Sequence, residues 1–544
     1  MTSGYPVCNG WSAGAPIGRR GTLVGAATAA GLGALAGASR PALAQEPRQG
    51  GVMRTMIAGD PPLLILGLST LAITQLVATK IYEGLVTFDP QLNPQPRLAK
   101  SWTISPDKKV FTFRLQENVR WHDGKPFTSE DVAFSIGSFQ AAVNARSKIM
   151  IDNIASIETP DPLTIVFTLK QSFEPFLYAF DVLNFAILPK HIYAGTDFRT
   201  NPANQTPIGT GAFKLKQWRR GTSIELERFD GYWMPGRPYL DGITYQIIAD
   251  RSGRSIALQT GQVQSAQIGD IEPSELARFR SMPNIEVSLD GWDYMSPLLY
   301  VGMNQRAKPL DDSRFRRALS MAIDRALVSQ RIFFGAAKPA TSPIPSTIRF
   351  HDPSVRLPPH DPAAAIRLLD EAGFRPDANG VRARLRLLGL GGATFWDSLN
   401  EYLKQAFAAI GVQVTVEVGD AASYVQKLAN WDYDLWVNWG SNFADPSIGI
   451  EKGYVTSNIQ KIAFSNTDGI SDPEVDRLFA AARSATTLEE RQKHFSDVQK
   501  VLIEQTRMLW VAEIRWPTLH DRRLHNITGR ATGVLGPYDD AWAG

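Results

Sequence analysis

The sequence predicts an α/β fold. Segments with the two-residue period of strands alternate along the chain with segments of helical period, and no internal repeat of about 20 to 50 residues is present. With 544 residues, 44% hydrophobic and 10% aromatic, the chain can bury a large core. This length suits roughly two to four folding units. These observations exclude a disordered chain, a solenoid and an all-helical bundle.

The first 44 residues are organised like a secretory signal peptide. Residues 1–20 contain no acidic side chain and end in Arg19-Arg20, a mildly apolar stretch follows, and Ala42-Leu43-Ala44 has the small residues that signal peptidase needs. We therefore expect cleavage after Ala44 and a secreted chain. A short buried Gly/Ala helix is the alternative, but such a segment forms helix poorly and lacks capping residues.

The export route stays open between the general secretory and twin-arginine pathways. Arg19-Arg20 resembles the twin-arginine motif, although Thr22 stands where that motif usually has an aromatic residue. The only cysteine, Cys8, precedes the apolar stretch, so the mature chain has no thiol for a disulfide, a lipid anchor or catalysis.

Charge and hydropathy exclude two classes of partner. The net charge is +3, and the leader holds three basic residues (Arg19, Arg20 and Arg40) and no acidic one, so the mature chain is close to neutral. Binding to nucleic acid or to an anionic membrane needs clustered basic residues. Beyond the leader, no apolar run approaches the ~20 residues of a spanning helix. We expect neither a nucleic-acid partner nor membrane insertion.

The N-terminal half contains clear elements. Residues 110–115 alternate as a half-buried strand, and Thr128 caps a helix whose apolar face comprises Val132, Ile136 and Phe139.

Two helices are predicted in the middle of the chain. One begins at Asp312 and continues to about Gln330, with an apolar face made of Phe315, Leu319, Ala322 and Ala326. The other has both ends specified, by Asp361-Pro362 at its start and Gly373 at its end.

Helices and strands alternate to the C-terminus. A helix over 399–410 precedes a strand over 412–418, and a short strand begins at 434–437. Residues 487–490 form a capping box for a further helix, and 509–512 predict a strand.

Four blocks of sequence carry a resemblance to a known family. They are IYEGL (81–85) with LAKSW (98–102); FRL (113–115) with WHDGKPF (121–127) and EDV (130–132); GTGAF (209–213) with GYW (231–233) and PYLD (238–241); and Asn304 with 311–312, RRAL (316–319) and AID (322–324). In order and spacing they resemble the family 5 solute-binding proteins, which serve peptide, nickel and related importers.

Most of these residues have structural roles. Asp123-Gly124 is a turn signal, and Gly211 suits a close approach of backbone. Trp102, Trp121 and Trp233 are expected to pack. The blocks therefore indicate the fold rather than the ligand.

The resemblance implies a two-lobed periplasmic-binding-protein fold of the cluster C type, with an extra subdomain inserted in the first lobe. The expected boundaries are 1–44 for the signal peptide; 45–80, 206–295 and 510–544 for the first lobe; 81–205 for the inserted subdomain; and 296–509 for the second lobe.

The function implied by the resemblance is that of the periplasmic substrate-binding protein of an ABC importer. It captures an oligopeptide or peptide-like solute by hinge closure and delivers it to the membrane permease. An opine, a glycan and chelated nickel stay open as ligands. The resemblance requires no cofactor and no covalent chemistry, and we expect a monomer.

In peptide-binding relatives, an acidic residue pairs with the α-amine of the ligand. The corresponding segment of this chain is residues 439–446. The best alignment places Asn442 there, and Asp445 takes the position if the alignment shifts. An amide lacks the charge that a buried ammonium needs. Residues 387–395 also lack the arginine that binds the ligand carboxylate in those relatives. Free dipeptides are therefore less expected as ligands.

Aromatic residues near these segments are candidates for stacking against the ligand, with core packing as the competing role. They are Trp292, Tyr294, Trp396, Trp439 and Phe443.

Enzyme classes find little support in the sequence. A secreted hydrolase is the main alternative, but no cysteine nucleophile, zinc motif or credible Ser/His/Asp signature is present in the mature chain. The seven histidines are scattered without metal-binding spacing. We expect no catalytic residues and no metal ligands.

Overall fold

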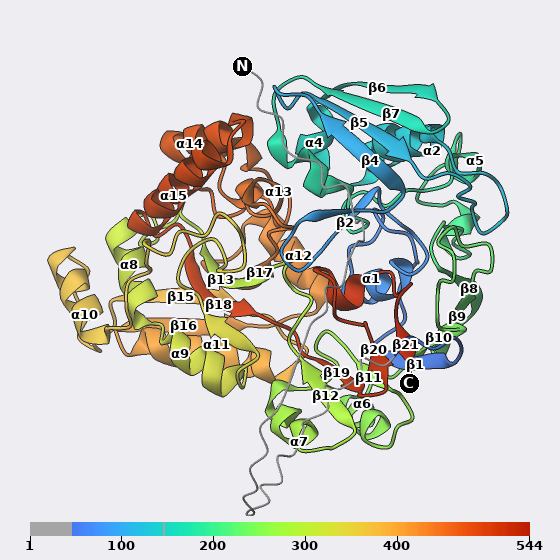
Figure 1. Ribbon diagram of the computed structural model, residues 1–544. Coiled ribbons are helices and arrows are strands. Elements are labelled where there is room, and N and C mark those ends of the chain that lie inside the picture. The colour runs from blue at the N-terminus through green and yellow to red at the C-terminus, as the bar shows by residue number, and fades with distance from the viewer. Residues whose placement is uncertain (1–45, 145–146) are drawn as a thin grey trace, which may run out of the picture. The chain divides into compact units, whose positions relative to one another are not determined.

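The computed structural model describes residues 46–144 and 147–544, in which three larger sheets, two two-stranded sheets and their helices form a mixed α/β structure (Figure 1). The predicted leader, its cleavage site after Ala44 and Cys8 lie outside the described residues. Within the described ranges, no helix combines the length and the hydropathy that crossing a bilayer takes.

The first lobe is built on a seven-stranded sheet of order β12-β19-β11-β1-β10-β9-β8. Strand β1 pairs in parallel with β10 and β11, and the remaining pairs are antiparallel. The elements are β1 (Val52–Ile57), α1 (Ala72–Ala78), β8 (Phe213–Arg219), β9 (Ser223–Arg228), β10 (Gly242–Ile247), α6 (Arg251–Gln259), β11 (Ser265–Ala266), α7 (Leu276–Arg280), β12 (Ile285–Ser288) and β19 (Thr518–Asp521).

The inserted subdomain is a four-stranded antiparallel sheet of order β4-β5-β7-β6, with helices beside it (Figure 1). Its elements are β4 (Ala99–Ile104), β5 (Val110–Leu115), α2 (Ser129–Phe134), the π-helix η1 (Ser135–Gln140), α3 (Ala141–Val143), α4 (Lys148–Asp152), β6 (Ile154–Asp161), β7 (Thr164–Leu169), the 3-10 helix η3 (Glu174–Phe180) and α5 (Lys190–Tyr193). A hairpin of β2 (Val86–Phe88) and β3 (Pro94–Pro96) precedes it.

The second lobe is built on a six-stranded sheet of order β14-β18-β13-β17-β15-β16. Its elements are β13 (Leu298–Met303), α8 (Ser313–Ala322), α9 (Arg325–Leu327), the π-helix η6 (Val328–Ile332), β14 (Ala337–Pro339), α10 (Pro362–Glu371), β15 (Ala383–Leu388), α11 (Thr394–Ala408), β16 (Val412–Glu417), α12 (Ala421–Asn430), β17 (Leu435–Gly440), α13 (Pro446–Gly449), α14 (Pro473–Ser484), α15 (Leu488–Glu504) and β18 (Leu509–Ile514). The fold class predicted from the sequence is confirmed, whereas the exact domain boundaries stay a prediction.

Local signals in the sequence predicted several elements closely. Strand β5 spans the predicted residues, and Thr128 caps α2 through a capping box with Asp131. Asp361 caps α10 by accepting a hydrogen bond from the backbone N–H of Ala364 at 2.8 Å. Gly373, just beyond this helix, has a φ of 88°.

The predicted helix from Asp312 to about Gln330 is not continuous. Helix α8 ends at Ala322 because Ile323 is extended, and Asp324 then caps α9 by accepting from the N–H of Leu327 at 3.0 Å. Ala326, predicted to face the core, is exposed. A second capping residue inside an apolar repeat therefore divided the helix.

The glycines of the GTGAF block provide close backbone packing. A Cβ at Gly211 would lie 2.5 Å from the carbonyl oxygen of Lys80, and one at Gly209 would meet the carbonyl oxygen of Ile81. The His122 ring also holds this block: Nε2 lies 2.9 Å from the Gly211 carbonyl oxygen, and Nδ1 accepts from Gly209 N–H at 3.3 Å. Burial lowers the pKa of His122 to about 4, so its ring is neutral near pH 7.

We predict that Gly211→Ala lowers the free energy of unfolding by about 1–3 kcal/mol, because the added methyl group has only rigid backbone around it. Gly59→Ala is the matched control, since a Cβ there meets no atom within 4 Å, and it should change stability by no more than about 0.5 kcal/mol. Urea denaturation measures both. Equal stabilities for the two variants would contradict this packing argument.

Candidate functional site

Two short crossing segments connect the lobes, one between β12 and β13 (residues 289–297) and one between β18 and β19 (residues 515–517). The indole Nε1 of Trp292 in the first segment donates to the carbonyl oxygen of Trp516 in the second at 2.7 Å. Both side chains are buried. This hydrogen bond joins the two crossing segments at the hinge.

The loop after β17 continues alongside the first crossing segment. The backbone N–H groups of Asn442 and Ala444 donate to the carbonyl oxygens of Met295 and Tyr294, each at 2.7 Å. Phe443 lies between them with a φ of 50°. The loop that carries three of the predicted site residues, Asn442, Phe443 and Asp445, is therefore fixed directly to the hinge.

Tyr294 contacts all three parts of the fold, and its backbone N–H reaches the first lobe by donating to the carbonyl oxygen of Ala531 at 3.0 Å. Its ring stacks on Phe88 at 5.3 Å between centroids and meets Phe443 edge-on at 6.1 Å. Its hydroxyl donates to the carbonyl oxygen of Tyr178 at 2.7 Å and accepts from Asn184 Nδ2 at 2.8 Å. Because Tyr294 is fully buried, these contacts give it a packing role at the hinge.

A second aromatic group surrounds Trp516. Its ring centroid lies 6.1 Å from that of Trp396 and 6.0 Å from that of Trp439. Phe395 also contacts both Trp516 and Trp396. Trp439 is half-buried, whereas Trp396 and Trp516 are buried. The predicted residues Trp396 and Trp439 thus both contact the ring of Trp516. The backbone carbonyl of Trp516 in turn accepts the hydrogen bond from Trp292.

Asn442 and Asp445 differ in how their side chains are satisfied. Asn442 is fully buried and donates from Nδ2 to the Ser296 carbonyl oxygen at 3.3 Å, and its Oδ1 has no hydrogen-bond partner among the described residues. Asp445 caps α13 through the N–H of Ser447 and forms an ion pair with Arg491 at 2.9 Å. The charge of Asp445 is therefore paired within the protein, whereas the buried amide oxygen of Asn442 has no hydrogen-bond partner among the described residues.

Arg491 links the second lobe to the inserted subdomain. In addition to Asp445, it pairs with Glu174 on η3 at 2.6 Å, and its guanidinium lies over the ring of Phe350 at 4.6 Å. The arginine side chain is only 2% exposed. Burial raises the pKa of Glu174, and the positive charge of Arg491 opposes that rise.

A further contact connects the lobes at another point. The backbone N–H of Thr394, at the start of α11, donates to Glu272 Oε1 of the first lobe at 3.2 Å. Glu272 also pairs with Arg251 at 3.2 Å. Together with the Glu174–Arg491 pair, this contact means that the two lobes meet in the structure.

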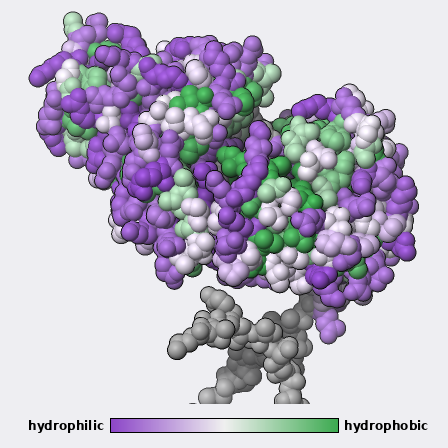
Figure 2. All heavy atoms as spheres, turned by 90° about the horizontal axis from the view of Figure 1, so that it is seen from above, coloured by the Kyte–Doolittle hydropathy of each residue, from purple (hydrophilic) through white to green (hydrophobic). Residues whose placement is uncertain are grey.

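One face of the molecule is hydrophilic over most of its area, and hydrophobic residues gather in its middle, where the surface is hollowed (Figure 2).

Among the described residues, no cluster of three or more His, Cys, Asp or Glu side chains has the arrangement that would hold a metal ion.

Two lobes joined by paired crossing segments, with contacts across them, define the class of hinged two-lobed binding proteins. The chain belongs to the bacterial extracellular solute-binding proteins of family 5, because the family model "Bacterial extracellular solute-binding proteins, family 5 Middle" matches residues 93–461. Members of this family bind solutes and work with ABC permeases.

Individual relatives agree with this assignment. The chain is 27% identical over 475 residues to the glutathione-binding protein GsiB of Escherichia coli strain K12, covering 84% of this chain and 87% of GsiB. The structure of the oligopeptide-binding protein AppA from Bacillus subtilis with a nonapeptide superimposes with a TM-score of 0.79 at 23% identity, covering 92% of this chain and all of AppA. NikA from Brucella suis with Fe(III)-EDTA gives a TM-score of 0.80 at 22% identity, covering 91% and 100%.

Sequence reasoning missed three residues that organise this region: Trp516, Arg491 and Glu174. Trp516 stands directly before Pro517, four residues beyond the predicted strand at 509–512, and its place in a chain crossing is visible only once the sheets are known. Arg491 and Glu174 are 317 residues apart, and no local pattern connects them.

We predict that Trp292→Phe lowers the free energy of unfolding by about 1–3 kcal/mol, because the buried carbonyl of Trp516 loses its donor and the smaller ring leaves space. Trp439→Phe makes the same change of size at a half-buried indole, for which the described residues provide no hydrogen bond, and should cost less than half as much. Chemical denaturation with tryptophan fluorescence measures both. A larger loss for the control would argue against the hinge bond.

Proposed function

We propose that this protein is the periplasmic substrate-binding protein of an ABC importer, that it captures an oligopeptide or peptide-like solute by closure of its two lobes, and that it presents the closed form to a membrane permease. The proposal includes export through a cleaved leader and a monomeric state. The observation that carries it is the ion pair between Glu174 and Arg491, which joins the inserted subdomain to the second lobe across the hinge.

Closure of the lobes gives the ion pair between Glu174 and Arg491 a function. When the lobes separate, Asp445 still pairs with Arg491, but Glu174 loses its partner. The pair therefore favours the closed form without contacting the solute, and a solute that touches both lobes shifts the same equilibrium further. No proton transfer or covalent step takes part.

The ligand class follows from the loop beside the hinge. We propose that Asn442 takes the place of the carboxylate that binds the ligand α-amine in peptide-binding relatives. Its amide oxygen, which has no hydrogen-bond partner among the described residues, would accept from the ligand. Trp396 and Trp439 would stack against flat or apolar parts of the solute. Asp445, already paired with Arg491, would support the loop rather than bind the amine. A neutral donor, such as an amide N–H, suits Asn442 better than a free ammonium.

Relatives bind varied solutes under their printed names: glutathione for GsiB, a nonapeptide for AppA, agropinic acid for AgaA and Ni(L-His) for NikZ. The fold therefore leaves the solute open within a broad range. A peptide with a blocked or modified amine, an opine or a metal chelate agrees with Asn442. The same proposal disfavours an unmodified dipeptide.

The direct test is mass spectrometry of solute released by denaturing protein purified from its native periplasm, followed by a thermal-shift assay with the recovered compound. We expect a compound without a free α-amine that raises the melting temperature. Recovery of a peptide with a free α-amine would overturn the interpretation of Asn442.

We predict that Glu174→Gln weakens binding of the recovered solute about 3- to 10-fold, because the closed form loses a desolvated ion pair. Glu130→Gln is the matched control: it lies in the same subdomain and removes an exposed ion pair with Lys190 at 2.9 Å, so affinity should be unchanged. Isothermal titration calorimetry measures the three proteins. Unchanged affinity in Glu174→Gln would show that the pair does not contribute to closure.

A further inference from the structure

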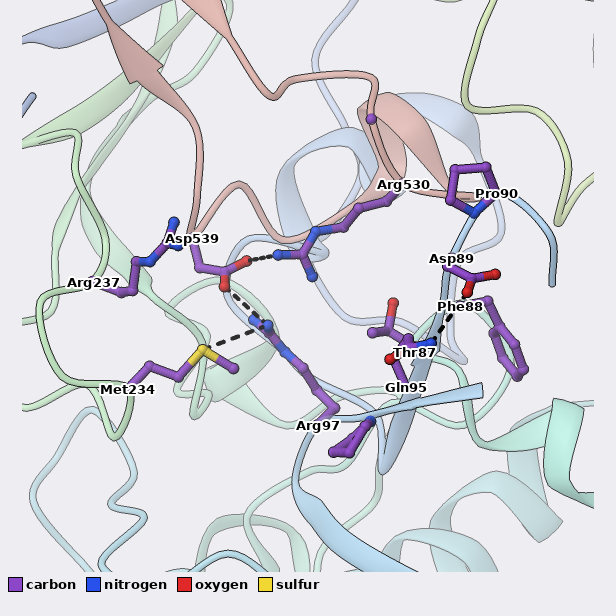
Figure 3. Close-up of a pocket in the computed structure, with 12 residues that line it drawn as sticks. Thr87, Phe88, Asp89, Pro90, Gln95, Arg97, Met234, Arg237, Arg530 and Asp539 are labelled. Carbon is purple, nitrogen blue, oxygen red and sulfur yellow. Dashed lines mark hydrogen bonds and ion pairs between the residues drawn. The ribbon is translucent and has the colours of Figure 1, made fainter. Parts of the chain in front are cut away.

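A pocket of about 340 Å³ lies at the junction of the first lobe and the inserted subdomain, and none of the candidate ligand-binding residues lines it. It lies between the β2–β3 hairpin, the turn at residues 234–237 and the C-terminal segment (Figure 3). Its lining residues are Thr87, Phe88, Asp89, Pro90, Gln95, Pro96, Arg97, Met234, Arg237, Gly529, Arg530 and Asp539.

Three arginines lie around this pocket, and two of them have carboxylate partners. Arg97 is buried and pairs with Glu83 at 2.8 Å and with Asp539 at 3.1 Å. Arg530 pairs with the other oxygen of Asp539 at 2.9 Å and with Asp540 at 3.2 Å. In Figure 3, Asp539 lies between the guanidinium groups of Arg97 and Arg530, so its charge is shared.

Arg237 has no such partner. Its guanidinium lies over the ring of Tyr239 at 4.2 Å, and neither a hydrogen-bond acceptor nor a carboxylate pairs with it among the described residues. Its Nη1 atom is also shielded from solvent. The charge of Arg237 is balanced only at longer range, by Asp539: together with Arg97 and Arg530, Arg237 holds the pKa of the Asp539 carboxyl below its ordinary value against the effect of burial. Figure 3 shows Arg237 on the opposite side of Asp539 from Arg530.

The remaining carboxylate in the wall is already engaged. Asp89 accepts hydrogen bonds from the backbone N–H groups of Gln91 and Asn93 and from the side chains of Asn93 and Gln95. These hydrogen bonds hold the Asp89 carboxylate within its own turn, and it forms no ion pair with Arg237. Pro90, Pro96 and Met234 give the pocket apolar walls.

Size, charge and apolar walls together describe one kind of ligand. A volume of this order suits a small organic molecule. Arginine recognises carboxylate and phosphate oxygens through its planar set of donors. An oxyanion at Arg237 would supply the missing partner, and a short carbon skeleton would cover the apolar wall.

We propose that this pocket binds a small organic anion whose carboxylate or phosphate group pairs with Arg237 and whose carbon skeleton lies against Pro96 and Met234. The site differs from the proposed solute site: its lining includes none of the residues predicted to bind the transported solute and no residue of the second lobe. Its ligand would therefore bind without closure of the lobes.

The test uses the intact mature protein with citrate and glycerol phosphate as carboxylate and phosphate probes. We expect at least one of them to raise the melting temperature beyond sodium chloride of equal ionic strength, and Arg237→Met to weaken that binding at least tenfold by calorimetry. Arg228→Met is the matched control, because Arg228 is a partly exposed arginine of the same lobe with carboxylate partners at Asp230 and Asp241. It should bind the probe like the unmodified protein.

A shift in neither probe, or an equal shift in Arg237→Met, would overturn the proposal. If Arg237→Met does not fold, crystals of the unmodified protein grown with selenate provide the answer. An anomalous peak beside Arg237 supports the site, and peaks only elsewhere contradict it.

Discussion

The hydrogen bond from Trp292 to the carbonyl oxygen of Trp516 is the interaction on which the rest of the arrangement depends. The described chain passes between the lobes in two short segments, and this bond joins them. The loop at 442–444 pairs with the same crossing segment, and the ring of Trp516 contacts Trp396 and Trp439. Candidate site residues of the second lobe therefore contact the hinge directly, so a change in lobe position changes the candidate site.

Two of the sequence blocks that resemble the family, the first and the third, meet elsewhere, at the junction of the first lobe and the inserted subdomain. Glu83 of the first block accepts from the Tyr232 hydroxyl at 3.0 Å and the Trp233 indole at 3.1 Å, both of the third block, and pairs with Arg97. Burial raises the pKa of Glu83, and Arg97 acts against that rise. These contacts explain why the motifs report the fold and leave the solute undetermined.

Local physics made much of the fold predictable. Strand β5 and the start of α10 followed from two-residue alternation and from an Asp-Pro helix start, signals that lie within a few residues of each other. The break at Ile323 escaped because Asp324, a second cap, sits inside an otherwise regular apolar pattern.

The candidate site was less predictable because its geometry is tertiary. Aromatic residues at 292, 396 and 439 were visible in the sequence, but nothing local indicated that Trp516 connects them. The buried state of Tyr294 and the pairing of Asp445 with Arg491 also depend on segments far apart in the chain. Charged residues in a helix are usually solvated, so Arg491 gave no signal of its own.

The central claim is that the lobes close about this hinge. The most direct measurement is the distance between spin labels at Glu158→Cys, in the inserted subdomain, and Arg477→Cys, on α14, both exposed positions. Pulsed electron resonance would compare protein carrying its co-purified solute with protein stripped of it by unfolding and refolding. Hinge closure predicts a single short distance with solute and a longer or broader distribution without it. Identical distributions in the two samples would contradict hinge closure.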